Sequence, residues 1–297
     1  MIRPEPEIIF TFVQTKRSMK VLYTALLALL LFPSCRRQSG DIDSFLHNAE
    51  SLMNEHPEDA LSIIRHIDRR KIYSSASEAR YALLYSQALD KNYVDVTSDS
   101  LTAVAVNYYD RHGTKHERAM AHYYQGRVYS NAGNFDAAIR SYSLAEDAAS
   151  GTDDYYLLGL INNAVGNLYY DQYDLKEALS RDQHAATYFH LAQSPYNEAL
   201  AYVGMGIVSN LMGDNEGMEK EYQKAIAIYE EIGAINEILP LYEDLVVKTR
   251  LDVGDDLFAI KRDLRRYYAK YNKGEIPLQS MGLWQGIYLK ANELDSA

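Results

Sequence analysis

A pattern that recurs every 40 residues constrains this fold more than any other feature of the sequence. Three segments each carry a glycine that is followed, 19 residues later, by an alanine. The glycines are Gly126, Gly166 and Gly206, and the alanines are Ala145, Ala185 and Ala225. A period of this length is typical of a repeat array, in which each unit covers an apolar face of its neighbour. The repeat therefore predicts a chain of stacked units.

The composition agrees with this prediction. The chain has 297 residues, 47% of them hydrophobic, which argues against a disordered chain. Only 16 glycines and 7 prolines are present, which disfavours a sandwich or barrel of many short strands. The formal net charge is −11, which disfavours binding to nucleic acid as the main activity. The single cysteine excludes an internal disulfide framework and a cysteine-based structural zinc site.

The repeat resembles the tetratricopeptide repeat (TPR), a helix-turn-helix unit whose first helix carries a small residue where the second helix crosses it closely. The best match has Gly126, Tyr129, the turn Gly133-Asn134-Phe135, Ala138, Tyr142 and Ala145 in the family's order. The next repeat has Asp182 where an aromatic residue is usual, and the third has Met218 in place of a small residue. The period of 40 residues suggests a variant with longer helices.

The register continues outside these segments, through Ser86, Val246 and Gly286. We predict an all-α fold, a right-handed TPR-like α-solenoid over residues 42–278, with about six helix pairs. Residues 279–297 form a terminal half-repeat, in which a capping helix over 279–293 packs on a helix over 256–273. The packing residues expected from the capping helix are Leu283, Trp284 and Ile287.

The amino-terminal segment reads as an export signal. An apolar run over residues 21–32 follows Lys16, Arg17 and Lys20, and twelve residues are too few to span a bilayer as a helix. The run ends in Phe32-Pro33-Ser34-Cys35, which resembles the lipobox of bacterial lipoproteins. The resemblance implies a signal peptide over 1–34, with Met19 as an alternative start, lipidation of Cys35 and a tether over 35–41. The alternative is that Cys35 is an ordinary residue beside a leader that is cleaved elsewhere or kept as an anchor.

A search for catalytic and metal-binding patterns gives no positive result. Gly204-Met205-Gly206 lacks the third glycine of a dinucleotide-binding loop and lies in a predicted helix. The histidines do not have the spacing of a zinc site. The pairs Asp153-Asp154 and Asp255-Asp256 precede predicted helices and are better explained as caps. We therefore predict no catalytic residue, metal or cofactor, and the chain is not expected to be an enzyme.

In the tetratricopeptide family the first helices of successive repeats line a concave groove that receives an extended peptide or a partner helix. The resemblance implies the same here, on positions adjacent to the repeat glycines. The groove candidates are Tyr123, Arg127, Asn163, Asn167, Tyr170 and Asn210. The side chains of Asn163 and Asn167 lie one turn apart, and an amide can both donate to and accept from a peptide backbone. The alternative is a groove that lies elsewhere or is filled by the chain's own terminus.

The leading functional hypothesis is a lipid-anchored scaffold or adaptor that binds a protein or peptide partner in the bacterial cell envelope, facing the periplasm or the cell surface. Two alternatives remain at this point. One is the sensory or regulatory ectodomain of a longer signalling protein, and the other is a glycan-capturing lipoprotein, because the chain has 26 tyrosines. A homodimer through the carboxyl-terminal end is a further alternative to a monomer.

Overall fold

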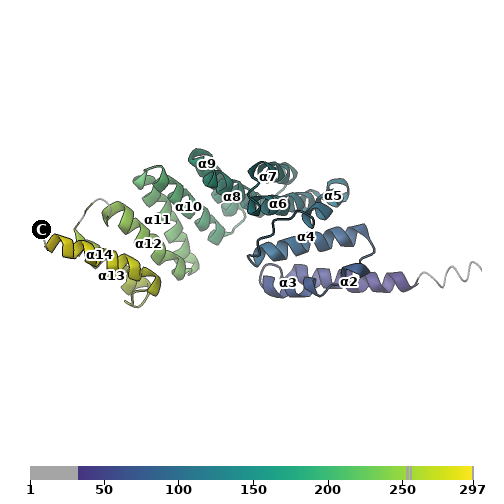
Figure 1. The fold of residues 1–297 in the computed structure, drawn as a ribbon, viewed down its shortest axis with the longest axis horizontal. Coiled ribbons are helices and arrows are strands. Elements are labelled where there is room, and N and C mark those ends of the chain that lie inside the picture. The colour runs from purple at the N-terminus through teal and green to yellow at the C-terminus, as the bar shows by residue number, and fades with distance from the viewer. Residues whose placement is uncertain (1–32, 252–253, 255, 296–297) are drawn as a thin grey trace, which may run out of the picture. The chain divides into compact units, whose positions relative to one another are not determined.

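The computed structural model describes the backbone of residues 33–251, 254 and 256–295, and the side chains of 42–250, 254 and 256–290. This part of the chain contains 13 α-helices and no β-strand (Figure 1). None of these helices combines the length and the apolar character needed to cross a bilayer. The chain divides into two compact units, the first ending at His112 and the second beginning at Gly113.

The first unit holds four α-helices, which pack as two pairs. They are α2 (Pro33–Leu52), α3 (Pro57–Arg65), α4 (Ser75–Lys91) and α5 (Thr102–His112), with a 3-10 turn η1 (Arg69–Lys71) between the pairs. Leu46, Ile64 and Leu84 are among the residues of its core. The helix α2 begins at Pro33, so the backbone over 35–41, which we expected to be a tether, is helical. The signal peptide prediction and the side chain of Cys35 lie outside the described residues, and lipidation stays a prediction.

The second unit holds the remaining nine α-helices of the described chain, and its helices pair in chain order. The pairs are α6 (Lys115–Asn131) with α7 (Phe135–Ala149), α8 (Tyr155–Asp171) with α9 (Leu175–Leu191), α10 (Pro195–Leu211) with α11 (Asn215–Ile232), and α12 (Ile238–Val246) with α13 (Leu257–Tyr271). Two 3-10 turns, η2 (Ile235–Glu237) and η4 (Leu278–Ser280), and a π-helix, η3 (Val247–Leu251), flank these later helices, and α14 (Met281–Asp295) follows. With the two pairs of the first unit, this confirms the predicted six pairs and one further helix.

The repeat glycines lie where the two helices of a pair cross. A Cβ atom added to Gly126 would lie 2.5 Å from the ring of Tyr142, and one added to Gly206 would lie 2.3 Å from the ring of Tyr222. Real side chains do not approach this closely, so glycine is what allows the tyrosine ring to pack against the first helix. The close crossing expected from the sequence is confirmed.

Capping side chains determine where the second helices begin. Their even spacing also accounts for the regular period of the repeat. Asn134, Asp174 and Asp214 are spaced by 40 residues, and each side chain accepts a hydrogen bond from a backbone amide in the first turn of α7, α9 or α11. Asp154 caps α8 and Asp256 caps α13 in the same way, which confirms the interpretation of these two aspartates as caps.

The helix α14 packs on α13 as predicted. Trp284 and Ile287 are buried in one core cluster with Ile260, Leu264 and Tyr268. The indole Nε1 of Trp284 also donates a hydrogen bond to the hydroxyl of Tyr268 at 3.1 Å. Burial of a tryptophan whose N–H has a partner is a strong source of packing energy, so Trp284 holds α14 against α13.

Candidate protein-interaction face

An exposed apolar stripe runs along α10, and its one half-buried member, Val203, also packs against the core that α11 contributes to. Leu200 is 40% exposed, Ile207 38% and Leu211 40%, and Val203 between them is half-buried. The spacing of i, i+3, i+7 and i+11 places all four on one face of the helix. We call these four residues the α10 stripe. The rest of α10 is buried through residues such as Met205, Gly206 and Val208, so the helix is apolar on both sides.

Charge is distributed unevenly between the first and second helices of the middle repeats. The first helix α8 contains one charged residue, Asp171, and the first helix α10 contains one, Glu198. The second helices α9 and α11 together contain eleven charged residues. A helix that is apolar around most of its circumference is usually buried in a core or covered by a partner. The outward faces of α8 and α10 therefore have the composition of an interaction surface.

The structure places the six predicted groove residues differently from one another. Asn167 and Tyr170 are exposed on α8, and Arg127, Asn163 and Asn210 are half-buried. Tyr123 is only 6% exposed, because its ring packs against the rings of Tyr124 and Tyr142 with centroids 5.0 and 5.9 Å apart. The expectation that Tyr123 offers an open contact surface is therefore wrong. Gly166 and Gly206 share one register, so Asn167 corresponds to Ile207 of the α10 stripe.

Asn163 does not present a free amide, because it hydrogen-bonds the carboxyl of Asp182 on α9. Asp182 is 4% exposed, and its Oδ1 has no hydrogen-bond partner. The carboxyl lies between two glycines: a Cβ on Gly166 would be 2.7 Å from Oδ1, and one on Gly204 would be 2.8 Å from Oδ2. Burial raises the pKa of the Asp182 carboxyl to about 7, and the hydrogen bond from Asn163 opposes that rise.

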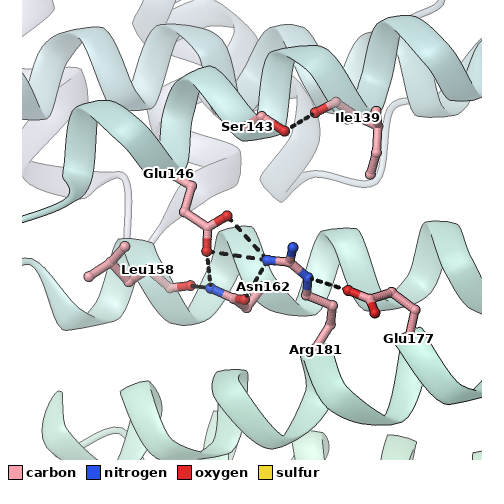
Figure 2. Close-up of polar contacts among 7 residues, drawn as sticks. All are labelled: Ile139, Ser143, Glu146, Leu158, Asn162, Glu177 and Arg181. Carbon is pink, nitrogen blue, oxygen red and sulfur yellow. Dashed lines mark hydrogen bonds and ion pairs between the residues drawn. The ribbon is translucent and has the colours of Figure 1, made fainter.

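A polar network holds the middle helices in place, as Figure 2 shows. The guanidinium of Arg181 on α9 donates to Glu146 of α7 at 3.1 Å and to the side-chain oxygen of Asn162 of α8 at 3.2 Å. Asn162 is fully buried and donates to the backbone oxygen of Leu158 at 3.0 Å. Glu177 accepts from Nε of Arg181 at 3.2 Å. These hydrogen bonds connect the three consecutive helices α7, α8 and α9. They hold α8 in a fixed orientation relative to its two neighbours.

Two acidic clusters contain no residue of the α10 stripe. His56, Glu58 and Asp59 stand close together and exposed at the start of α3, where acidic residues favour a helix amino terminus. A polar cleft of about 570 Å³ borders the turn between α7 and α8, and Glu146, Asp147 and Asp153 are among its lining residues. Neither cluster has a second feature that would indicate a ligand.

Comparison with known proteins shows similarity of fold. No protein-family model matches the chain, and no curated protein sequence matches it either. The crystal structure of BtubC (BKLC) from P. vanneervenii is 16% identical, with a TM-score of 0.55, over 82% of this chain and 94% of that one. A signal transduction ATPase with numerous domains (STAND) from Pyrococcus horikoshii, which has a tetratricopeptide repeat sensor, is 15% identical with a TM-score of 0.63. That match covers 84% of this chain and 38% of the other.

This chain has a helical-repeat fold. The likeness to a protein with a tetratricopeptide repeat agrees with the repeat read from the sequence, and at these identities it concerns the fold alone.

Proposed function

We propose that this protein is a tetratricopeptide-like scaffold or adaptor that binds a protein partner on the outward faces of α8 and α10. The observation that carries the proposal is the α10 stripe, in which three large aliphatic side chains are about 40% exposed on one helix face. Covering apolar surface stabilises a complex by roughly 25 cal/mol per Å². Exposed Asn167 and Tyr170 on α8 add polar and aromatic contacts beside the stripe.

We also propose that the protein acts at the bacterial cell envelope, attached through a lipid on Cys35. The order of basic residues, apolar run and small residue before Cys35 supports this location. Mass spectrometry of the protein made in bacteria tests it. We expect an amino terminus at Cys35 that carries a lipid mass, and an unmodified Cys35 in a water-soluble form would contradict the anchor.

The binding proposal is tested by capture from solubilised bacterial membranes with three baits. The first is the wild type, the second is the double variant Leu200→Gln and Ile207→Gln, and the third is the control Leu144→Gln and Leu191→Gln. The control residues are 50% and 52% exposed on α7 and α9, so both pairs remove comparable apolar surface. We expect a discrete protein to bind the wild type and the control but not the stripe variant.

Equal capture by all three baits would contradict the proposed face. Retention of the wild type on a polysaccharide column, without any protein partner, would instead favour glycan capture. Circular dichroism of both variants checks that each remains folded.

A further inference from the structure

We infer that the partner segment seated on the α10 stripe is an amphipathic α-helix with basic residues at one end of its apolar face. This inference rests on the proposed function and specifies the partner that the face accepts. It follows from three observations: the chemistry of the stripe, its length, and the charges beside it.

The chemistry of the stripe favours a helix over an extended peptide. An extended segment carries backbone N–H and C=O groups that need new partners, and leaving them unmet against an apolar surface costs free energy. The stripe residues Leu200, Val203, Ile207 and Leu211 offer no side-chain hydrogen bonds. On α8, Asn163 is already bonded to Asp182, so the pair of amides that could have held an extended backbone is reduced. A helix satisfies its own backbone groups and needs only apolar contact.

The stripe also has the dimensions of a helix contact. From Leu200 to Leu211 the helix rises roughly 16 Å, at about 1.5 Å per residue. A partner helix of three to four turns, with apolar residues at i, i+3 or i+4, and i+7, presents a matching face.

The charges beside the stripe are acidic. Residues 155–232 contain eleven aspartates and glutamates against four lysines and arginines, and most of these fifteen residues lie on α9 and α11. The two acids that matter for the stripe are those near its Leu211 end. Asp171 is exposed at the carboxyl end of α8, in the position that corresponds to Leu211 of α10, and exposed Asp214 follows Leu211 by three residues. Lysines or arginines of a partner would meet these carboxylates at the Leu211 end.

Synthetic peptides of 18 residues test this directly. The first contains leucine and lysine at helical spacing, and the second has the same composition in strict alternation, which favours an extended strand. A third replaces lysine by glutamate in the helical arrangement. Binding of labelled peptides to the purified full chain is measured by fluorescence anisotropy, with the stripe variant Leu200→Gln and Ile207→Gln and the control variant Leu144→Gln and Leu191→Gln. All proteins keep the same amino-terminal segment, so binding elsewhere cancels in the comparison.

We expect the basic helical peptide to bind the wild type and the control equally, and the stripe variant about tenfold more weakly. The alternating and acidic peptides should bind at least tenfold more weakly than the basic helical one. Equal binding of the alternating peptide, or no effect of the stripe substitutions, would overturn the inference. A wild-type dimer in light scattering that becomes monomeric in the stripe variant would also overturn it, since a second copy would then occupy the stripe. If membrane capture depends on the stripe but no helical peptide binds, the proposed function stands and only this inference fails.

Discussion

The carboxyl of Asp182 packs closely against Gly166. If Gly166 carried a Cβ atom, that atom would lie only 2.7 Å from Oδ1 of Asp182. In the repeats before and after, the corresponding contacts are made by the rings of Tyr142 and Tyr222. The middle repeat therefore contains an ionisable group in a position that its neighbours fill with an aromatic ring. Ionising a buried carboxyl is costly, so this substitution makes the middle repeat sensitive to pH.

The contribution of Asp182 to the free energy of unfolding should fall as the pH rises through the range from 4 to 7. The pKa of Asp182 is about 7 in the folded chain against 3.8 as its ordinary value, so the folded state binds more protons than the unfolded state in this window. The stabilisation is complete below pH 3.8 and is lost by about pH 7. A shift of this size corresponds to at most about 4 kcal/mol. Urea unfolding of the wild type and Asp182→Asn at pH 4, 6 and 8 measures it.

Other carboxyl groups also titrate over this range, and they contribute equally to both proteins. The expected signal is therefore the difference between the wild type and Asp182→Asn, which should change in favour of the variant as the pH rises. Parallel pH profiles would show that Asp182 does not titrate in this window.

Gly206 and Gly286 occupy the same register but should respond oppositely to alanine. Gly206→Ala places a methyl group 2.3 Å from Tyr222 and should cost about 1–3 kcal/mol through overpacking. Nothing lies within 4 Å of a Cβ built on Gly286, so Gly286→Ala should stabilise α14 by about 0.5–1 kcal/mol through helix propensity. Thermal unfolding of the two variants separates these effects. Destabilisation by both substitutions to the same extent would contradict the open surroundings of Gly286.

The sequence was sufficient for most of the fold because repetition amplifies weak signals. One glycine at a helix crossing is ambiguous, but three glycines with alanines at a fixed offset predicted the pairing of α6 with α7, α8 with α9 and α10 with α11. The contact of Trp284 with α13 was also predicted, since the register and the apolar spacing of the two helices agree. The helical backbone over 35–41 was not, because the resemblance to a lipobox implied a tether that follows Cys35.

The candidate face was predicted less well, for a physical reason. The register identifies which side of a helix points outward, but it does not say which side chains fold back onto a neighbour. Tyr123 turns into the aromatic cluster with Tyr142, and Asn163 turns toward Asp182. The signal for Asp182 was present, as an acid where an aromatic residue is usual. The signal for the α10 stripe was also present, as the helical spacing of Leu200, Ile207 and Leu211 on either side of Gly206.

The network around Arg181 should be sensitive to loss of its buried amide. Asn162→Ala removes the acceptor of Arg181 and the donor to Glu146, and should lower the free energy of unfolding by about 1–3 kcal/mol. Ser143→Ala is the matched control: the Ser143 hydroxyl donates to Ile139 on an exposed side of α7, and its loss should cost no more than about 0.5 kcal/mol. Urea denaturation of both variants checks this, and equal costs would show that the network contributes little.

The packing of α14 on α13 should depend on the side chain of Trp284. Trp284→Ala removes a side chain that is 2% exposed, and should destabilise the contact of α14 with α13 by about 3–5 kcal/mol. Leu289→Ala, at a residue 57% exposed on the same helix, should change stability by less than about 0.5 kcal/mol. Hydrogen exchange over residues 257–290 resolves the two. If the amides of α13 stay protected in Trp284→Ala, α14 is not the cover that the packing implies.

The central claim is that a protein partner contacts the outward face of α10, and crosslinking in living bacteria tests it most directly. A photoreactive benzoylphenylalanine replaces Ile207 in one strain and Leu144, on the exposed side of α7, in another. After irradiation we expect a discrete crosslinked protein from position 207 and none of the same mass from position 144. The same adduct from both positions, or an adduct from position 144 alone, would contradict the account.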